Sequence, residues 1–352
     1  MRWGVLVRYG VVSSYSASLK TVGQDIVYAL NANGYEATFY RYLITPSEAK
    51  EQFDRGIVFI PFDPVYMASW VLLQRDLRNI GIPAITYTTV EGKPKKRLID
   101  HWILRDGLFV ANSYFTKWMI EMVGAKVIDV IPHGVNMQQI KSFKPPVKML
   151  KKEIGAEVLF GTVASYMTRK GLDKLAMVAS MVQNEIPDAK FYVLTTPRGT
   201  SELQQLKNVY VDMRYGSLSR GELLQLIGSF DYYLCTSHAE GFCLPVLEAQ
   251  AMGVPVIYPD YKPISEFTDK NANFPVKVIE VKEEEHGFGI LFRMHYYDIE
   301  EMANQVINAY EVYTCSPEEY EKRSKKVVRN AKKYDAVKVY KKFVKVFDRY
   351  FP

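Results

Sequence analysis

Short apolar runs alternate with amphipathic stretches along the whole chain. In the first half, strand-like apolar runs are predicted at 3–10, 56–62, 83–89 and 127–136. A helical pattern over 18–34 ends at Gly34, a residue typical of helix C-termini. Strands separated by helical stretches of this length usually pair in parallel, so the pattern predicts an α/β protein with a doubly wound sheet.

The alternation is interrupted once and then restarts. Residues 141–158 are rich in lysine and contain Pro145–Pro146, which predicts a linker. Beyond it, further apolar runs such as "EVLFGTVAS", "DYYLCTS" and "VPVIYP" predict a second parallel sheet. The expected organisation is an N-terminal domain of 1–145 plus 334–352 and a C-terminal domain of 146–333. Two doubly wound domains of this kind are expected to face each other across a cleft.

Composition narrows the class of protein. A chain of 352 residues with 48% hydrophobic residues suits two folded domains. No apolar run reaches the length of a membrane span, and "MRWGVLVRYG" lacks the pattern of a signal peptide, so a cytoplasmic protein is expected. The three cysteines, Cys235, Cys243 and Cys315, have no CxxC spacing, which argues against a disulfide framework or a zinc site.

The net charge of +6 is distributed unevenly, in basic clusters at 93–97, 141–152 and 322–333. Each cluster alone is typical of a solvated helix face, whereas together they would attract anions. No nucleic-acid-binding motif accompanies them, so no nucleic-acid partner is expected. Lysines interleaved with Trp102, Phe115 and Trp118 allow contact with an anionic membrane surface, against the alternative of an ordinary solvated helix.

The segment "HAEGFCLPVLEAQAMGVPVIYPD" (238–260) holds the most informative chemistry. Glu240 follows a predicted strand, in the loop where open parallel sheets bind ligands. Pro245 then suits a helix start, which leaves the backbone N–H groups of Phe242, Cys243 and Leu244 available to phosphate. Glu248, one turn into that helix, suits a ribose diol because two hydroxyls can donate to one carboxylate. Glu240 suits a sugar hydroxyl, so this order of groups predicts a nucleotide-sugar site.

This segment resembles the E-x7-E motif of retaining glycosyltransferases of family 4, which have the GT-B fold. Further segments that match in order are "ANSYFTKWMIEMVGA", "VIPHGVN", "FGTVASYMTRKG", "GSLSRGELLQLIGSFDYYLCTSHAEG" and "GFGILFR". The resemblance covers most of the chain and is most specific over 208–258. It implies transfer of a hexose from a nucleoside-diphosphate sugar to an acceptor hydroxyl. The acceptor is a sugar, lipid or protein that the sequence does not identify, and neither a cofactor nor a metal is required.

The resemblance also implies roles for individual residues. Glu240 contacts the donor sugar and Lys170 neutralises the diphosphate, with help from Arg169. Glu248 binds the ribose, and the remaining donor-binding residues are expected to be Ser165, Gly241, Phe242, Cys243 and Leu244. The C-terminal helix (332–351) is expected to return to the first domain and bury its apolar stripe of Val337, Tyr340, Phe343, Val344, Phe347 and Phe351.

The chain departs from the family pattern in three places. No arginine precedes Lys170 by about six residues, so Arg169 is expected to replace that charge. Serines at 13–18, with Ser14 and Ser16 as candidates, stand where a glycine pair is usual. Glu91 lies where a histidine is usual and is the candidate for orienting sugar or acceptor. His133 and His238 are further candidates for residues lining the cleft.

Two alternatives to a retaining glycosyltransferase stay open at this point. One is a nucleotide-sugar-binding protein without turnover, which the missing arginine and the altered first loop allow. The other is a GT-B-fold epimerase that acts on the nucleotide-sugar itself. A dinucleotide oxidoreductase is disfavoured because no G-x-G-x-x-G follows the first strand.

Overall fold

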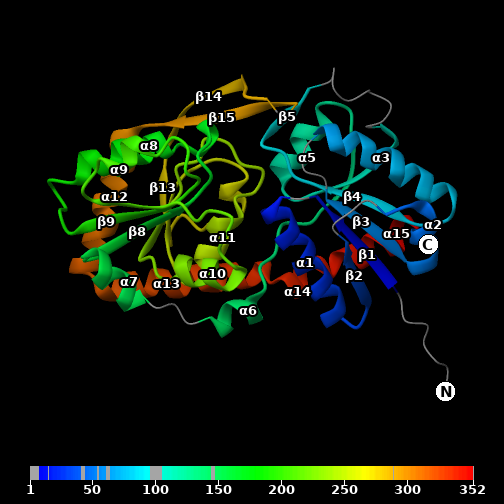
Figure 1. The fold of residues 1–352 in the computed structure, drawn as a ribbon, viewed down its shortest axis with the longest axis horizontal. Coiled ribbons are helices and arrows are strands. Elements are labelled where there is room, and N and C mark those ends of the chain that lie inside the picture. Colours follow the sequence, from blue (N-terminus) through cyan, green and yellow to red (C-terminus); the bar gives the residue numbers. More distant parts are fainter. Residues whose placement is uncertain are drawn as a thin grey trace. The chain divides into compact units, whose positions relative to one another are not determined.

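A computed structural model describes residues 8–14, 16–40, 44–53, 55–60, 64–95, 105–143, 147–287 and 289–351 (Figure 1). Residues 3–7 of the first predicted strand, Trp102, Pro145 and Pro146 lie outside these ranges. The chain divides into two compact units. Unit 1 consists of Met1–Asn136, Glu283–Phe292 and Lys333–Pro352, and unit 2 of Met137–Lys282 and Arg293–Lys332.

Unit 1 contains a six-stranded sheet in the order β2-β1-β3-β4-β6-β7, in which every pair is parallel. Its strands are β1 (Arg8–Ser13), β2 (Glu36–Tyr40), β3 (Gly56–Ile60), β4 (Ala84–Thr88), β6 (Leu108–Ala111) and β7 (Lys126–Val130). The helices between them are α1 (Ala17–Ala32), α2 (Pro46–Gln52), α3 (Pro64–Asn79) and α5 (Tyr114–Glu121). The central strands are apolar on both faces, as a sheet covered by helices requires.

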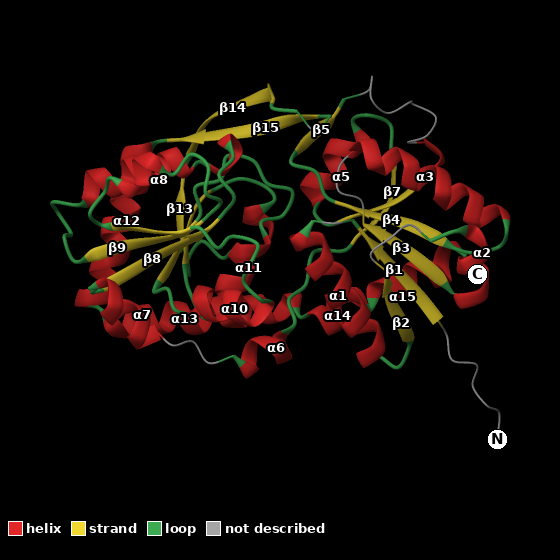
Figure 2. Cartoon of the chain, in the orientation of Figure 1, coloured by secondary structure: helices red, strands yellow, loops and turns green. Residues whose placement is uncertain are grey.

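Unit 2 repeats this plan with a parallel sheet in the order β10-β9-β8-β11-β12-β13. Its strands are β8 (Val158–Val163), β9 (Ala189–Leu194), β10 (Val209–Asp212), β11 (Tyr232–Leu234), β12 (Val256–Pro259) and β13 (Phe274–Val276). Its helices are α6 (Met137–Ser142), α7 (Val147–Ile154), α8 (Leu172–Val182), α9 (Ser201–Gln204), α10 (Arg220–Gly228), α11 (Leu244–Ala251), α12 (Ile299–Cys315) and α13 (Pro317–Ala331). Helices flank both faces of each sheet (Figure 2). Two doubly wound parallel sheets are therefore confirmed.

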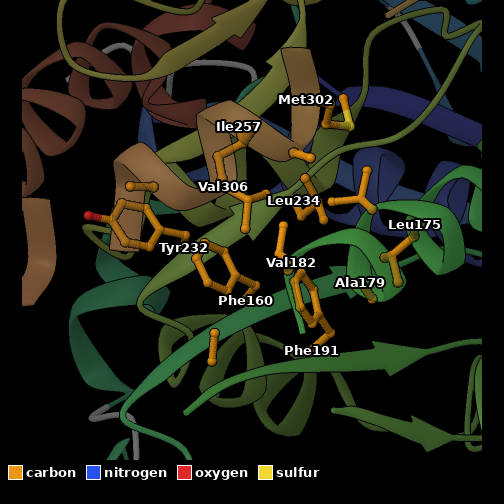
Figure 3. Close-up of a cluster of buried hydrophobic side chains, with 14 of the residues drawn as sticks. Phe160, Leu175, Ala179, Val182, Phe191, Tyr232, Leu234, Ile257, Met302 and Val306 are labelled. Atoms are coloured by element: carbon orange, nitrogen blue, oxygen red, sulfur yellow. The ribbon is translucent and has the colours of Figure 1, made fainter. Parts of the chain in front are cut away.

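The core of unit 2 lies between its sheet and the helices α8 and α12 (Figure 3). Phe160 on β8 stacks on Phe191 of β9 at 5.3 Å between ring centroids and on Tyr232 of β11 at 5.5 Å. Each of these large side chains removes some 150–250 Å² of surface from water, which makes them the main contributors to the packing of this sheet. The core thereby holds the carboxyl ends of β8 and β11 at fixed positions.

The described structure differs from the sequence predictions at two connections. The predicted linker over 141–158 contains the end of α6 and the whole of α7, and the Lys151 ammonium on α7 lies 2.8 Å from the buried Asp231 carboxylate. The predicted boundaries also placed 283–292 in the second domain. Instead, these residues join β14 (Val278–Glu285) to β15 (Ile290–Tyr297), and the start of β15 pairs antiparallel with β5 (Gly92–Pro94).

The C-terminal segment is not the single helix that its apolar spacing predicts. It forms a 3-10 turn (Lys332–Tyr334), α14 (Ala336–Tyr340) and α15 (Lys342–Tyr350), with Asp335 capping α14. Tyr340, Phe343, Val344 and Phe347 of the predicted stripe are buried. The Phe347 ring packs against Tyr9, and a side chain at Gly56 would collide with it, so this segment completes the core of unit 1.

Candidate functional site

The candidate site is built where β8 and β11 end, at the carboxyl edge of the sheet of unit 2. The turn Thr168–Lys170 after β8 lies against the chain that follows β11. The Thr236 hydroxyl donates to the Lys170 carbonyl at 2.9 Å, and the His238 N–H donates to the Arg169 carbonyl at 2.7 Å. Gly171 has φ +62°, and a Cβ there would lie 2.2 Å from the Thr236 carbonyl oxygen. Only glycine allows this approach.

The contact between these two loops brings two cations to one acid. The Lys170 ammonium lies 2.5 Å from one oxygen of Glu240, and the Arg169 guanidinium lies 3.5 Å from the other. Arg169 also donates to the Ala239 carbonyl at 3.1 Å. Burial would raise the pKa of Glu240, which is only 5% exposed, but the two cations outweigh it and the pKa is lowered. The structure thus brings together three residues that the sequence proposes for the donor site.

Glu248, the second acid of the motif, has a partner that the sequence analysis missed. The carboxylate is buried on α11, and the Arg220 guanidinium of α10 lies 2.5 Å from it. Arg220 lies in a segment that matches the family pattern, but the sequence analysis assigned it no role. Only the packing of α10 on α11 brings it to Glu248.

The predicted anion-binding loop at 241–244 combines backbone and packing roles. Cys243 has φ +76°, a conformation rare for a residue other than glycine, and α11 begins at the next residue. The N–H groups of Cys243 and Leu244 donate to no backbone carbonyl of the described residues. The Phe242 ring instead stacks on Phe267 at 4.6 Å, so its side chain belongs to the core.

The Cys243 thiol lies 3.9 Å from the Cys235 thiol, and both are buried. The contact with Cys235 and burial together raise the pKa of Cys243. The thiol is therefore a neutral group beside Glu240 rather than a nucleophile.

His238 packs against β15 and fixes the loop that carries Glu240. Its ring stacks on Tyr297 at 5.1 Å between centroids, and its Nδ1 lies 3.1 Å from the His295 carbonyl oxygen. The His295 N–H donates in return to the His238 carbonyl at 2.8 Å, and burial lowers the pKa of His295 to about 4. The buried pair holds the backbone just before Glu240.

One further polar group at this edge lacks a partner. Thr195, at the end of β9, is fully buried, and its hydroxyl makes no hydrogen bond within the part of the chain that the structure describes. Ser165, after β8, is half-buried at the same edge. Unpaired buried polar atoms are rare in native proteins, and a bound ligand is one way to satisfy them.

The carboxyl edge of the sheet in unit 1 carries the remaining predicted residues. The Ser14 and Thr88 hydroxyls are buried there without a hydrogen-bond partner among the described residues. Ser16 precedes α1 and its hydroxyl bonds that of Ser18 at 3.0 Å. Glu91 lies half-buried between β4 and β5. The sequence analysis did not single out Thr88, which reads as an ordinary strand residue.

His133 lies in a buried network of unit 1 rather than on an open surface. Its Nδ1 lies 2.9 Å from the Tyr87 hydroxyl and its Nε2 lies 3.1 Å from the Asn112 amide nitrogen. Because Tyr87 donates to the Ile131 carbonyl at 2.8 Å, the ring must donate from Nδ1 and accept at Nε2. Burial lowers the pKa of His133 to about 3, so the ring is neutral. The described contacts of His133 are packing contacts within unit 1, and its role in lining a cleft stays a prediction.

The described residues show neither a metal-binding cluster nor a membrane-spanning helix. No three histidine, cysteine, aspartate or glutamate side chains gather in an arrangement suited to a metal ion. Within the same residues, no helix combines the length and apolarity needed to cross a membrane.

Known proteins resemble this chain in sequence. Residues 157–311, which include the Lys170–Glu240 cluster and Glu248, match the family described as glycosyl transferases group 1. The chain is 29% identical over 349 residues to "Uncharacterized glycosyltransferase 335" of Sulfolobus islandicus rod-shaped virus 1. That alignment covers 96% of this chain and 100% of the viral protein.

Solved structures share the fold over almost the whole chain. A glycosyltransferase from Rickettsia africae ESF-5 has a TM-score of 0.71 at 14% identity, with 98% of each chain covered. A UDP-forming α,α-trehalose-phosphate synthase from Burkholderia xenovorans has a TM-score of 0.71 at 11% identity, covering 97% of this chain and 99% of that one. The fold is therefore that of the GT-B glycosyltransferases, and the match of 157–311 together with this fold supports a glycosyltransferase.

Proposed function

We propose that the chain is a retaining glycosyltransferase of family 4, which moves a hexose from a nucleoside-diphosphate sugar to an acceptor hydroxyl. The observation that carries the proposal is the convergence of Lys170 and Arg169 on the buried Glu240. Two cations and one acid at the carboxyl edge of a parallel sheet provide for a diphosphate and a sugar hydroxyl at neighbouring positions. This arrangement supports the donor role of the E-x7-E motif.

Each residue then has a defined task in donor binding. Lys170 and Arg169 balance the diphosphate charge, and the N–H groups of Cys243 and Leu244 donate to its oxygens. Glu240 accepts a hydrogen bond from the sugar, and Glu248 accepts from the ribose hydroxyls. A UDP-forming relative in fold is consistent with such a donor, although the base is left open.

The proposed reaction needs no protein nucleophile. The bond between the anomeric carbon and the phosphate oxygen breaks, and its electron pair leaves with the nucleoside diphosphate. The acceptor oxygen bonds the anomeric carbon on the same face, and its proton passes to the departing phosphate oxygen. Fixed positive charge beside that phosphate lowers the barrier, because it acts where negative charge develops. Lys170 and Arg169 supply this charge without a metal ion.

A transfer assay tests the proposal. The protein is incubated with UDP- and GDP-hexoses and simple sugar acceptors, with and without EDTA, and release of nucleoside diphosphate is measured. We expect release that EDTA does not abolish and that Lys170→Ala nearly eliminates. Proton NMR of the product should show the anomeric configuration of the donor, whereas the inverted configuration would contradict a retaining mechanism.

The same assay separates the two alternatives. Tight nucleotide-sugar binding without release of nucleoside diphosphate for any acceptor would indicate a binding protein. A changed sugar in a reaction without acceptor would indicate an epimerase.

The exposed face of α5 supports a lipid surface on the acceptor side. Tyr114, Trp118 and Met122 are exposed at intervals of four residues along this helix, with Lys117 beside them. Such spacing gives one amphipathic stripe suited to the boundary between headgroups and acyl chains. Co-sedimentation with anionic vesicles at low salt, lost in Trp118→Ala, is the expected result, and no binding at low salt removes the membrane from the proposal.

A further inference from the structure

Glu248 is poorly satisfied for a buried carboxylate. Its side chain is 2% exposed, and Arg220 is its one charged partner among the described residues, at 2.5 Å from Oε1. Apart from this contact, no described group donates a hydrogen bond to Oε1. A carboxylate has about four acceptor positions, so most of the capacity of Glu248 is unused.

Glu240, the first acid of the motif, is contacted by more groups than Glu248. Both of its oxygens face cations, and the Ser237 side chain adds a hydrogen bond that favours the ionised form. Glu240 is thus held by several groups, whereas Glu248 depends on a single guanidinium. A buried charge with one partner is strongly destabilised when that partner is removed.

The backbone of Arg220 is anchored independently of Glu248. Arg220 is the first residue of α10, directly after a capping box: the Ser219 N–H donates to the Glu222 carboxylate at 2.7 Å, and the Glu222 N–H donates to the Ser219 hydroxyl at 3.3 Å. The Arg220 side chain is 21% exposed, and its buried Nε has no hydrogen-bond partner within the described ranges. The guanidinium therefore contacts Glu248 from a helix start whose backbone is fixed. Its Nε–H remains available to donate a further hydrogen bond.

We propose that Arg220 is a positioning residue for ribose recognition: it holds Glu248 as a buried carboxylate whose remaining lone pairs accept the ribose hydroxyls. This inference rests on the proposed donor site. It assigns the selectivity of that site for ribose to a residue outside the E-x7-E motif. A Glu248 carboxylate displaced from this position would accept fewer hydrogen bonds from a diol. Loss of Arg220 is therefore expected to weaken recognition of ribose specifically, not of phosphate.

Calorimetry on the full chain with UDP, 2′-deoxy-UDP and inorganic pyrophosphate tests this, with GDP and 2′-deoxy-GDP in parallel. Wild-type protein is expected to prefer the ribonucleotide by at least about tenfold, the usual size of a hydrogen bond to a charged group. In Arg220→Met the preference should fall to within about twofold, while pyrophosphate affinity stays unchanged. Arg220→Lys should restore part of the preference because it keeps the charge.

Arg323→Met is the matched control. Arg323 is equally exposed at 21% and lies 3.1 Å from Glu319, but it packs over Phe274 at the amino end of β13, away from the carboxyl edge. This variant should keep the wild-type preference. Combined with Glu248→Gln, Arg220→Met should add no further loss of ribose preference, since both act on one contact.

The outcomes separate the two proposals. If wild type selects the ribonucleotide and Arg220→Met selects it equally well, the role of Arg220 is refuted and the donor site stands. If Arg220→Met weakens UDP and pyrophosphate alike, its role is general and the inference is again wrong. Wild-type protein that binds neither UDP nor GDP removes the donor site, and the inference with it.

Discussion

The carboxyl edges of the two sheets have the same backbone plan but opposite chemistry. In unit 2 the edge carries Lys170, Arg169 and Glu240 in contact, and Arg220 with Glu248 beside them. In unit 1 the corresponding edge presents the Ser14 and Thr88 hydroxyls, which have no hydrogen-bond partner among the described residues, together with the half-buried Glu91. Its histidine, His133, is buried and neutral.

Under the proposed function, this difference assigns donor binding to unit 2 and acceptor binding to unit 1. Charges that are held ready without a ligand suit a donor whose diphosphate brings its own negative charge. Unpaired hydroxyls suit a neutral acceptor that offers hydroxyls of its own. Under the proposed function, the same topology would serve two ligands because the loops, not the sheets, differ.

The largest expected effect is a loss of stability in unit 1 that leaves donor binding unchanged. Phe347→Ala removes a buried ring that fills the space above Gly56 and should cost about 3–5 kcal/mol of unfolding free energy. Denaturant unfolding measures this loss. Below the melting temperature the affinity for UDP should stay within about twofold of wild type, because the charged edge belongs to unit 2. A large fall in affinity at low temperature would contradict the division.

Lys170→Ala should reduce turnover by about 10²–10³-fold, the range seen when one group that stabilises developing charge is removed. The affinity for UDP should fall much less, since the charge on the leaving group peaks in the transition state. Steady-state kinetics and calorimetry give the two numbers. Lys174→Ala is the control and should behave as wild type, because Lys174 pairs with its neighbour Asp173 on α8 and not with Glu240.

The neutral His133 makes stability depend on pH. Its pKa is about 3 when folded and near 6.5 when unfolded, so the unfolded state binds the proton first as the pH falls. Its contribution is complete above about pH 6.5 and declines by about 1.4 kcal/mol per pH unit between 6.5 and 3. His295, with a pKa of about 4, acts in the same direction. Urea titrations at pH 7, 6 and 5 should show the decline, with a shallower slope in His133→Gln.

The smallest expected effect tests the Thr88 hydroxyl at the carboxyl edge of unit 1. Thr88→Val removes an unpaired hydroxyl while keeping its shape, so stability should change by less than about 1 kcal/mol. If the hydroxyl binds the acceptor, the KM for acceptor should rise about three- to tenfold with the KM for donor unchanged. An equal rise in both KM values would argue against separate roles for the two edges.

Much of the fold could be predicted because it depends on local patterns. Apolar runs of strand length between helical repeats identify both sheets, and the order of Glu240, Pro245 and Glu248 places two acids around a helix start. Lys170 and Arg169 were proposed for the same ligand as Glu240, and the structure brings all three into contact. The strands and the order of the two acids follow from spacing along the chain, whereas the roles of Lys170 and Arg169 are what the resemblance to family 4 implies.

Other features depend on contacts between distant residues, and only the tertiary structure decides them. The apolar stripe at 337–351 predicts one helix, but Asp335 and Lys341 interrupt it so that its rings can pack into unit 1. Burial makes His133 a neutral packing residue, although its turn sequence allows a ligand role. Arg220 lies 28 residues from Glu248 in the chain (248 − 220 = 28), and the packing of α10 on α11 alone pairs them. The sequence determined which residue types follow each strand, whereas packing determined which charges meet, because an ion pair depends on distance in space.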